Sequence, residues 1–367
     1  MYSELTYKIA FGSLKGMNFQ LASELLSRVG SEQNFFSASH DSLKSILGFD
    51  SKLIANDYRL EILEKAVEET AFVDDNKINI IYFTDDDYPQ RLKECDDAPA
   101  LMYSLGNCDF NSNHVISIVG TRHATPYGIH FISELVEEIS RRLPNTIIVS
   151  GLAYGVDITA HKEALNHKLS TVAVLAHGLS TIYPAPHRSV AVEMIRKNGM
   201  LLTEYSHVAK MNRGNFIARN RIVAGISECT VIVESGIKGG AMITANIANS
   251  YNRDVFALPG RNSDLYSQGC NHLITENMAT LIQNLDDLVM AMRWETKPIE
   301  KEQPKLVINL SEEEQKVVDF LKDNGEGNIN RISVETGLKI HRLVSLLVDM
   351  EFKGLLLAYP GGLYRLA

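Results

Sequence analysis

Positively charged side chains gather in one short stretch of an otherwise acidic chain. The segment NRGNFIARNRIVAG (212–225) carries Arg213, Arg219 and Arg221 and contains no Asp or Glu. The formal net charge of the 367 residues is −9, yet residues 113–296 hold nearly equal numbers of basic and acidic residues, so the acidity lies in the flanks. A local positive face in the middle of the chain can therefore attract a negatively charged ligand.

Three more segments bring glycine next to polar or basic residues directly after an apolar run. Glycine lets backbone amides approach an anion closely, and a helix that starts there presents further amides. The segment GTRHATPYG supplies the candidates Gly120, Thr121 and Arg122. The segment SGLAYG supplies Gly151, and ESGIKGG supplies Lys238 and Gly239. The first segment lacks the G-x-G-x-x-G spacing of a standard dinucleotide site. With the basic stretch, the segments indicate a ligand that carries phosphate.

Several other side chains keep two interpretations. Phe216 could stack on a nucleic-acid base or pack into the core beneath its helix. Arg221 could contact the ligand or brace the loop through hydrogen bonds. Asp157 and His161 are four residues apart on a predicted helix, so they could form half of a metal site or serve the structure alone. Because no third ligand is evident, we expect no metal and no cofactor.

The sequence also offers serine and histidine side chains for covalent catalysis, but none lies in a G-x-S-x-G motif. These residues are Ser150, Ser180, His177 and His187. We expect all four to serve the structure, and we expect no enzymatic activity.

The candidates follow strands of a predicted parallel sheet. Across residues 114–293, apolar runs such as HVISIVG, NTIIVSG and CTVIVES alternate with helical patterns such as HFISELVEEISRRL. Continuous apolar strands with intervening helices predict a doubly wound, Rossmann-like α/β fold with a mostly parallel sheet. Such sheets bind ligands beyond the carboxyl ends of their strands, where the glycine-bearing segments lie. Before this region, residues 76–112 predict one strand, INIIYF, followed by an irregular connector.

The remaining segments predict two further domains. Residues 1–75 show short helical patterns separated by glycines, as in SAM or helix-hairpin-helix domains. Residues 311–367 predict three helices and a hairpin, as in a winged helix. Ser311 and Glu314 have the spacing of a capping box at the start of the last domain. The expected layout is a helical domain (1–75), an extended Rossmann-like domain (76–296), a linker (297–310) and a winged helix (311–367).

Composition argues against several classes of protein. The four cysteines form no C-x-x-C pair, so neither a zinc site nor a disulfide framework is indicated. The N-terminus lacks the pattern of a signal peptide, and no apolar run reaches the roughly 18 residues of a membrane helix. We expect a reduced, cytoplasmic protein with no membrane partner.

The order of the motifs resembles the DprA/Smf family of DNA-processing proteins. The motifs SIVGTRHATPYG, IVSGLAYGVDITAHKEAL, HGLSTIYPAPHR, NFIARNRIVAGIS, VIVESGIKGGAMITANIA, RDVFALPG and QGCNHLI span about 85–295. The resemblance implies a non-enzymatic protein that binds single-stranded DNA in a basic pocket at the strand ends. It implies loading of a RecA-type recombinase during natural transformation and recombination, and a homodimer built through the Rossmann-like domain.

The resemblance assigns the candidate DNA-binding residues by their motifs. Arg122 is the best-matched phosphate ligand, Arg213 lies where family members carry a basic DNA contact, and Phe216 matches the family aromatic residue. Ile217 stands where the family usually has proline, and the loop before Ala241 differs from the usual S-G-S or S-G-A. The full candidate set is Gly120, Thr121, Arg122, Gly151, Arg213, Phe216, Arg219, Arg221, Lys238 and Gly239.

Two other functions remain open on the sequence alone. A nucleotide phosphoribohydrolase shares a similar sheet but uses a glutamate after a P-G-G motif, whereas no acid follows Glu234 in the corresponding stretch. A transcription regulator would combine a ligand-sensing α/β domain with duplex binding through the winged helix.

Overall fold

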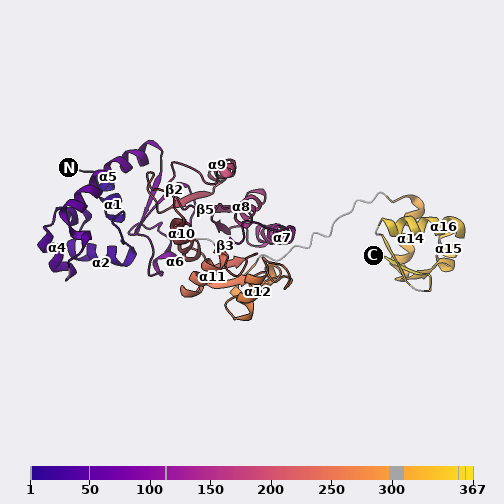
Figure 1. Cartoon of the computed structure of the whole chain (residues 1–367). Coiled ribbons are helices and arrows are strands. Elements are labelled where there is room, and N and C mark those ends of the chain that lie inside the picture. The colour runs from indigo at the N-terminus through magenta and orange to yellow at the C-terminus, as the bar shows by residue number, and fades with distance from the viewer. Residues whose placement is uncertain are drawn as a thin grey trace. The chain divides into compact units, whose positions relative to one another are not determined.

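The computed structural model describes residues 2–48, 50–111, 114–296, 310–353, 355–359 and 361–366. The chain divides into two compact units, Met1–Ile299 and Glu300–Ala367 (Figure 1). Apart from its last residue, the predicted linker 297–310 lies outside the described residues.

The first unit begins with a group of helices. Four of them start at Ser or Asn residues whose side chains accept a backbone N–H of the first turn, which is why these helices begin where they do. The helices are α1 (Glu4–Gly12), α2 (Phe19–Val29), α3 (Glu32–Ser37), α4 (His40–Leu47), the short η1 (Lys52–Ile54) and α5 (Asn56–Asp75). The predicted helical character of this region is confirmed.

A nine-stranded sheet in the order β1-β2-β6-β5-β4-β3-β7-β8-β9 forms the centre of the first unit. The seven strands from β6 to β9 are parallel, while β1 and β2 pair antiparallel at one side. The strands are β1 (Asn79–Tyr82), β2 (Leu101–Gly106), β3 (Val115–Val119), β4 (Ile147–Ser150), β5 (Ser170–Val174), β6 (Met200–Thr203), β7 (Cys229–Ile232), β8 (Asp254–Ala257) and β9 (Thr280–Leu281). The predicted mostly parallel α/β sheet is confirmed.

Helices cover both faces of this sheet. The α7, α8 and α13 side chains pack with Ile116 and Ile118 on one face, and α10 and α11 pack with Val115 and Val119 on the other. Figure 1 shows α7 and α8 on one side of the strands and α11 on the other. This double cover explains why β3 is buried at every position and apolar at all but Ser117, rather than alternating. The helices are α6 (Gln90–Lys93), α7 (Pro126–Arg142), α8 (Val156–Asn166), η2 (Ala185–His187), α9 (Arg188–Arg196), α10 (Arg213–Gly225), α11 (Gly240–Ser250), α12 (Gln268–Thr275) and α13 (Leu285–Met292).

The predicted irregular connector before the parallel sheet is wrong in one part. The run ALMYSLG forms β2, whose Tyr103 pairs with Thr203 of β6. Pro and Asp upstream mark the turns around α6, but the apolar run after them is buried and can only satisfy its backbone groups in the sheet. The N-terminal helices share a hydrophobic core with this part of the sheet, so the predicted domain boundary near residue 75 stays a prediction.

The second unit has its own apolar core, in which Val317, Leu321, Ile332, Leu343 and Leu347 are buried. Its helix α14 begins with the predicted capping box of Ser311 and Glu314, which is confirmed. The described residues of this unit form three helices and a three-stranded antiparallel sheet of order β10-β12-β11. These elements are α14 (Glu312–Asn324), β10 (Gly327–Asn328), α15 (Ile329–Thr336), α16 (Ile340–Phe352), β11 (Leu356–Tyr359) and β12 (Leu363–Leu366).

None of the described helices combines the length and the apolar character that a membrane-spanning helix needs.

Candidate nucleic-acid interface

The candidate residues meet where the order of the parallel strands reverses direction, at β3. From β3 the chain first continues to β4, on one side, and later returns to β7, on the other. The loop after β3 is held from both sides, because the Thr121 N–H donates to the Glu234 carbonyl oxygen at 2.6 Å and the Thr121 carbonyl accepts from the Val156 N–H at 3.1 Å. A crevice beyond the carboxyl ends at such a point is where open α/β sheets bind ligands.

Two glycines allow the loops after β3 and β4 to interlock. A Cβ atom on Gly120 would lie 2.5 Å from Cγ2 of Val156, and one on Gly155 would lie 2.3 Å from the Thr121 carbonyl oxygen. Gly155 also has a φ of +73°, a conformation that residues with side chains rarely adopt. This close packing leaves the next side chain, Arg122, exposed at the edge of the sheet.

Arg122 lies against an aromatic pair at this edge. Its guanidinium carbon is 5.9 Å from the centroid of the Phe216 ring, and that ring meets Tyr183 edge-on with centroids 5.8 Å apart. Phe216 is half-buried and Tyr183 is 44% exposed, so both rings reach solvent. The Tyr183 N–H is directed at Nε2 of His177 at 3.2 Å, which anchors the loop that carries the tyrosine. A cation beside exposed rings suits a phosphate with a neighbouring base.

No pattern in the sequence pointed to Tyr183. It lies 33 residues before Phe216, so no local pattern links the two rings. Its position in the loop after β5 was the available signal, because the other candidates also follow strands.

Helix α10 presents a second cation beside the pair. Its first residue, Arg213, is exposed and lies three residues before Phe216, so the two side chains share a face. The start of the helix is fixed by Asn215, whose amide donates to the carbonyl oxygens of Ala176 at 3.2 Å and Lys210 at 3.3 Å. Within the described part of the chain, Arg122 and Arg213 have no carboxylate partner and remain available to an anion.

Arg219, further along the same helix, lies inside the protein. It is 5% exposed and its Nη1 donates to the Val174 carbonyl oxygen. The geometry does not fit the predicted DNA contact, because the guanidinium is enclosed between the sheet and the loop after β4. A Cβ atom on Gly151 would lie 2.0 Å from the Arg219 Nη1, so this glycine makes room for the arginine.

The carboxylate next to this buried arginine belongs to Asp157, at the start of α8. Asp157 accepts the N–H groups of Gly151 at 3.1 Å and Ala153 at 3.3 Å. Burial raises the pKa of the Asp157 carboxyl above its ordinary value, and the positive charge of Arg219 opposes that effect. Burial likewise lowers the pKa of the Arg219 guanidinium. The pair supports the loop from below and is sealed from solvent.

The possible metal ligands are also engaged within the fold. His161 is fully buried, its Nδ1 lies 2.7 Å from Oγ1 of Thr171, and burial lowers its pKa to about 3, so the imidazole is neutral at pH 7. Within the described ranges, no group of three His, Cys, Asp or Glu side chains is placed to hold a metal ion. Asp157 and His161 therefore have structural partners in this fold.

Arg221 also has protein partners. Its guanidinium donates to the Asp97 carbonyl oxygen and to the Glu204 carboxylate. Burial raises the pKa of Glu204, while the charge of Arg221 lowers it. This arrangement fits the bracing interpretation of Arg221.

Lys238 and Gly239 lie at the neighbouring strand end, after β7. Gly239 caps α11, and a Cβ atom there would lie 2.3 Å from Oγ of Ser235, so the tight turn requires glycine. Lys238 is exposed at the tip of this turn. The structure thus brings Arg122, Arg213 and Phe216 together directly and adds Lys238 from the next loop along the same edge.

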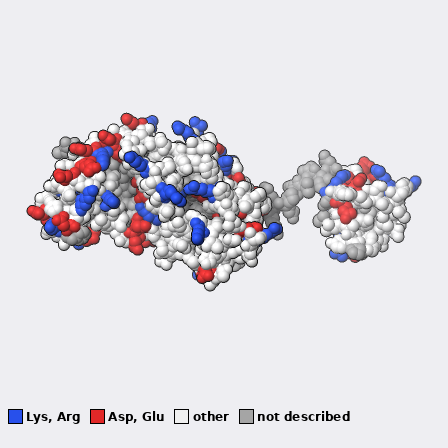
Figure 2. All heavy atoms as spheres, viewed as in Figure 1, with Lys and Arg blue, Asp and Glu red and all other residues white. Residues whose placement is uncertain are grey.

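The surface charge agrees with this placement. On the face shown in Figure 2, Lys and Arg atoms gather near the middle of the first unit, while Asp and Glu atoms are frequent over the N-terminal helices. The basic groups lie over the region that Figure 1 labels α10 and β5.

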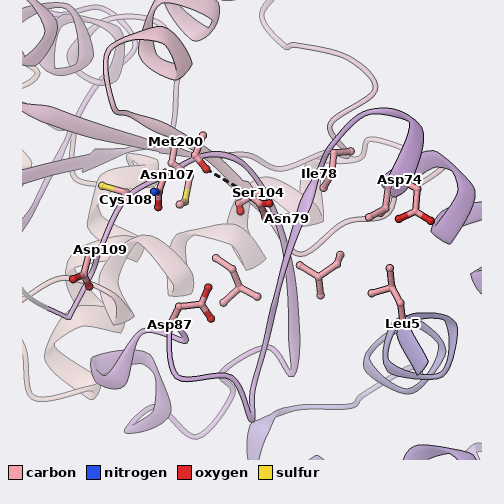
Figure 3. A pocket seen from close by; sticks show the side chains of 14 residues that line it. Leu5, Asp74, Ile78, Asn79, Asp87, Ser104, Asn107, Cys108, Asp109 and Met200 are labelled. Atoms are coloured by element: carbon pink, nitrogen blue, oxygen red, sulfur yellow. Dashed lines mark hydrogen bonds between the residues drawn. The ribbon is translucent and has the colours of Figure 1, made fainter. Parts of the chain in front are cut away.

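A pocket at the opposite edge of the sheet has the wrong charge for phosphate. It has a volume of about 420 Å³ and includes Gly106 and Met200, which pair at the amino end of β6 (Figure 3). Its described lining includes the carboxylates of Asp74, Asp87 and Asp109 and no Lys or Arg. The basic edge is therefore the better candidate for a nucleic-acid interface.

Comparison with known proteins agrees with this geometry. The family model described as "DNA recombination-mediator protein A" matches residues 79–293. Protein Smf of Synechocystis is 34% identical over 79% of this chain and 73% of its own length. A putative DNA processing protein DprA of Mycobacterium tuberculosis is 35% identical over 72% of this chain and 68% of its own.

Two solved structures are also similar. DNA processing protein A of Streptococcus pneumoniae has a TM-score of 0.66 and 28% identity, covering 79% of this chain and 98% of that one. The Helicobacter pylori protein, described for its single-stranded DNA binding mode, has a TM-score of 0.52 and 29% identity, covering 59% of this chain and 96% of that one. The chain therefore belongs to the DNA recombination-mediator protein A family, which includes the DprA and Smf proteins.

Proposed function

We propose that the chain binds single-stranded DNA at the carboxyl edge of its sheet, with Arg122 and Arg213 on phosphates and Phe216 under a base. The observation that carries the proposal is the contact of exposed Arg122 with the Phe216 ring at 5.9 Å. The Helicobacter pylori relative, a DprA described as binding single-stranded DNA, supports the same ligand class.

Stacking gives the preference for single strands. The face of a base in a duplex is covered by its neighbours, whereas a base in a flexible single strand can turn onto an aromatic ring. The half-exposed rings of Phe216 and Tyr183 offer that surface next to a cation. The backbone amides of the first turn of α11, which begins after Gly239, can add contacts to phosphate oxygens.

The direct test is a titration of labelled oligo-dT with wild type and Arg122→Ala. Loss of a charge-assisted hydrogen bond predicts about ten-fold weaker binding or more. Arg196→Ala is the matched control, because Arg196 is exposed at the end of α9, at the opposite edge of the sheet. No binding by wild type at low salt, or equal losses in the two variants, would refute the proposal.

We also infer that the protein serves DNA processing in transformation and recombination, where it would load a RecA-type recombinase. Membership of the family and the names of its DprA relatives support this role. Homodimer formation through the first unit belongs to the same proposal. A pull-down with a purified RecA-type recombinase, and the mass of the free protein in solution, test the two parts separately.

We propose that the second unit is a winged helix. The three helices followed by a hairpin support that assignment, and α16 would be its recognition helix. Its basic residues are mixed with Asp349 and Glu351, which favours protein docking or weak DNA contact over strong duplex binding. Deleting 305–367 should leave single-strand affinity largely intact, whereas a transcription regulator would lose its DNA.

The enzyme alternative has less support. Glu234, the acid nearest the crevice, accepts the Thr125 N–H at 2.8 Å and the Thr125 hydroxyl at 2.6 Å. It is 2% exposed, so its carboxylate is occupied in holding the loop. Assay of nucleoside monophosphate cleavage with wild type and Glu234→Gln checks this reading.

A further inference from the structure

A pocket of about 940 Å³ lies directly beside the Arg122 loop. Thr125, Tyr127 and Glu234 line it, together with residues of the segment 259–267. The His123 ring, next in sequence to Arg122, stacks on Tyr266 with centroids 6.1 Å apart. A strand held by Arg122 therefore lies near both the Phe216 ring and this pocket.

The lining of the pocket suits a base better than a phosphate. Its charged side chains are two carboxylates, Glu234 and Asp264, and one guanidinium, Arg261, so the pocket has a negative surplus. Its apolar surface comes from the rings of Tyr127 and Tyr266 and from Leu265. Flat rings and an aliphatic side chain bind the face of a base, while the negative surplus repels phosphate oxygens.

The walls of the pocket are fixed in position. The Tyr127 hydroxyl donates to the Pro259 carbonyl oxygen at 2.8 Å, and the Ser235 N–H donates to the Tyr266 carbonyl oxygen at 2.6 Å. These contacts tie the 259–267 segment to the loops after β3 and β7. A pocket that is already formed needs little ordering when a base enters.

We propose that this pocket takes one base of the bound single strand and favours a base with an exocyclic amino group. The inference rests on the proposed function, because the strand must first be held at Arg122. The Asp264 carboxylate is a hydrogen-bond acceptor that can pair with N4 of cytosine or N6 of adenine. Thymine has no amino group; its single edge donor is the ring N3–H, which lies further back on the base than the N4 or N6 amino group.

The test is competition of unlabelled oligo-dC and oligo-dT of equal length against a labelled oligonucleotide, with the full chain. Oligonucleotides differ in stacking and flexibility, so the readout is the change in the dC-to-dT affinity ratio caused by Asp264→Ala. One hydrogen bond predicts a drop in that ratio of at least about three-fold. The matched control is Asp254→Ala, which removes an exposed carboxylate at the amino end of β8 and should leave the ratio unchanged.

Arg122→Ala separates this proposal from the one it rests on. This variant should lower the affinity for both oligonucleotides and leave the dC-to-dT affinity ratio unchanged. Unchanged affinity for both would instead contradict the Arg122 site. Equal ratios in wild type, Asp264→Ala and Asp254→Ala would overturn the base pocket.

Cross-linking gives a second readout that needs no variant. An oligonucleotide containing 5-iododeoxycytidine should form a photoadduct within 259–267. Adducts confined to peptides outside this segment and outside 121–127 would overturn the proposal.

Discussion

The start and the middle of α10 carry similar residues in different environments. At its start, Arg213 and Phe216 reach solvent at the carboxyl edge of the sheet, with Arg122 against the ring. Two turns later, Arg219 is 5% exposed and bonded to Val174. An arginine-rich stretch can therefore combine arginines that contact a ligand with arginines that brace the fold, and burial of the side chain distinguishes one kind from the other.

The largest effect should follow from removing the buried brace. Arg219→Ala leaves the Val174 carbonyl without its donor and removes the positive charge beside the buried Asp157 carboxylate, so we expect a loss of about 3–5 kcal/mol in the free energy of unfolding. Trp294, the single tryptophan, packs against His114 with ring centroids 4.2 Å apart within the first unit, so its fluorescence in a denaturant titration reports on that unit. Unchanged stability would show that the arginine is no brace.

A smaller loss in the free energy of unfolding should follow from filling the space that the Arg219 guanidinium occupies. Gly151→Ala puts a methyl group where the Arg219 guanidinium lies, and overpacking of this kind costs about 1–3 kcal/mol. Gly240→Ala is the control, because a Cβ atom there meets nothing within 4 Å. The same fluorescence titration measures both variants, and equal midpoints would contradict the close packing of Gly151 and Arg219.

A substitution at the exposed start of α10 should change the affinity for DNA rather than the stability of the fold. Phe216→Ala removes a stacking surface, which predicts about 1–3 kcal/mol weaker binding of oligo-dT with the unfolding midpoint little changed. Phe216→Tyr should restore most of the affinity, since the ring is kept. A variant that unfolds early but binds normally would place Phe216 with the core.

Most strands of the sheet could be predicted from the sequence, but the contacts that distinguish the arginines could not. The apolar runs predicted the seven parallel strands, because strands buried on both faces are mostly apolar, and the run INIIYF predicted the antiparallel β1. They missed β2, whose run ALMYSL follows turn-forming residues. The contact of Tyr183 with Phe216 joins segments 33 residues apart, so only the fold could reveal it.

A signal for the buried arginine was present in the sequence. Ile222 and Val223 follow Arg219 by three and four residues, so all three lie on one stripe of the helix, and that stripe is buried. Arg213 lies off this stripe. Periodicity therefore separates Arg219 from Arg213, although it cannot identify the Asp97 and Glu204 partners of Arg221, which come from distant segments.

We infer that the exposed start of α10 holds DNA while the middle of the helix holds the fold. The most direct test is the salt dependence of oligo-dT affinity for Arg213→Ala and Arg221→Ala, which each remove one positive charge from the same helix. We predict that Arg213→Ala reduces the slope of log affinity against log salt by about 0.7, while Arg221→Ala keeps the wild-type slope. Equal slope reductions in both variants, or a reduction in Arg221→Ala alone, would contradict the assignment of Arg213 to DNA binding and Arg221 to the fold.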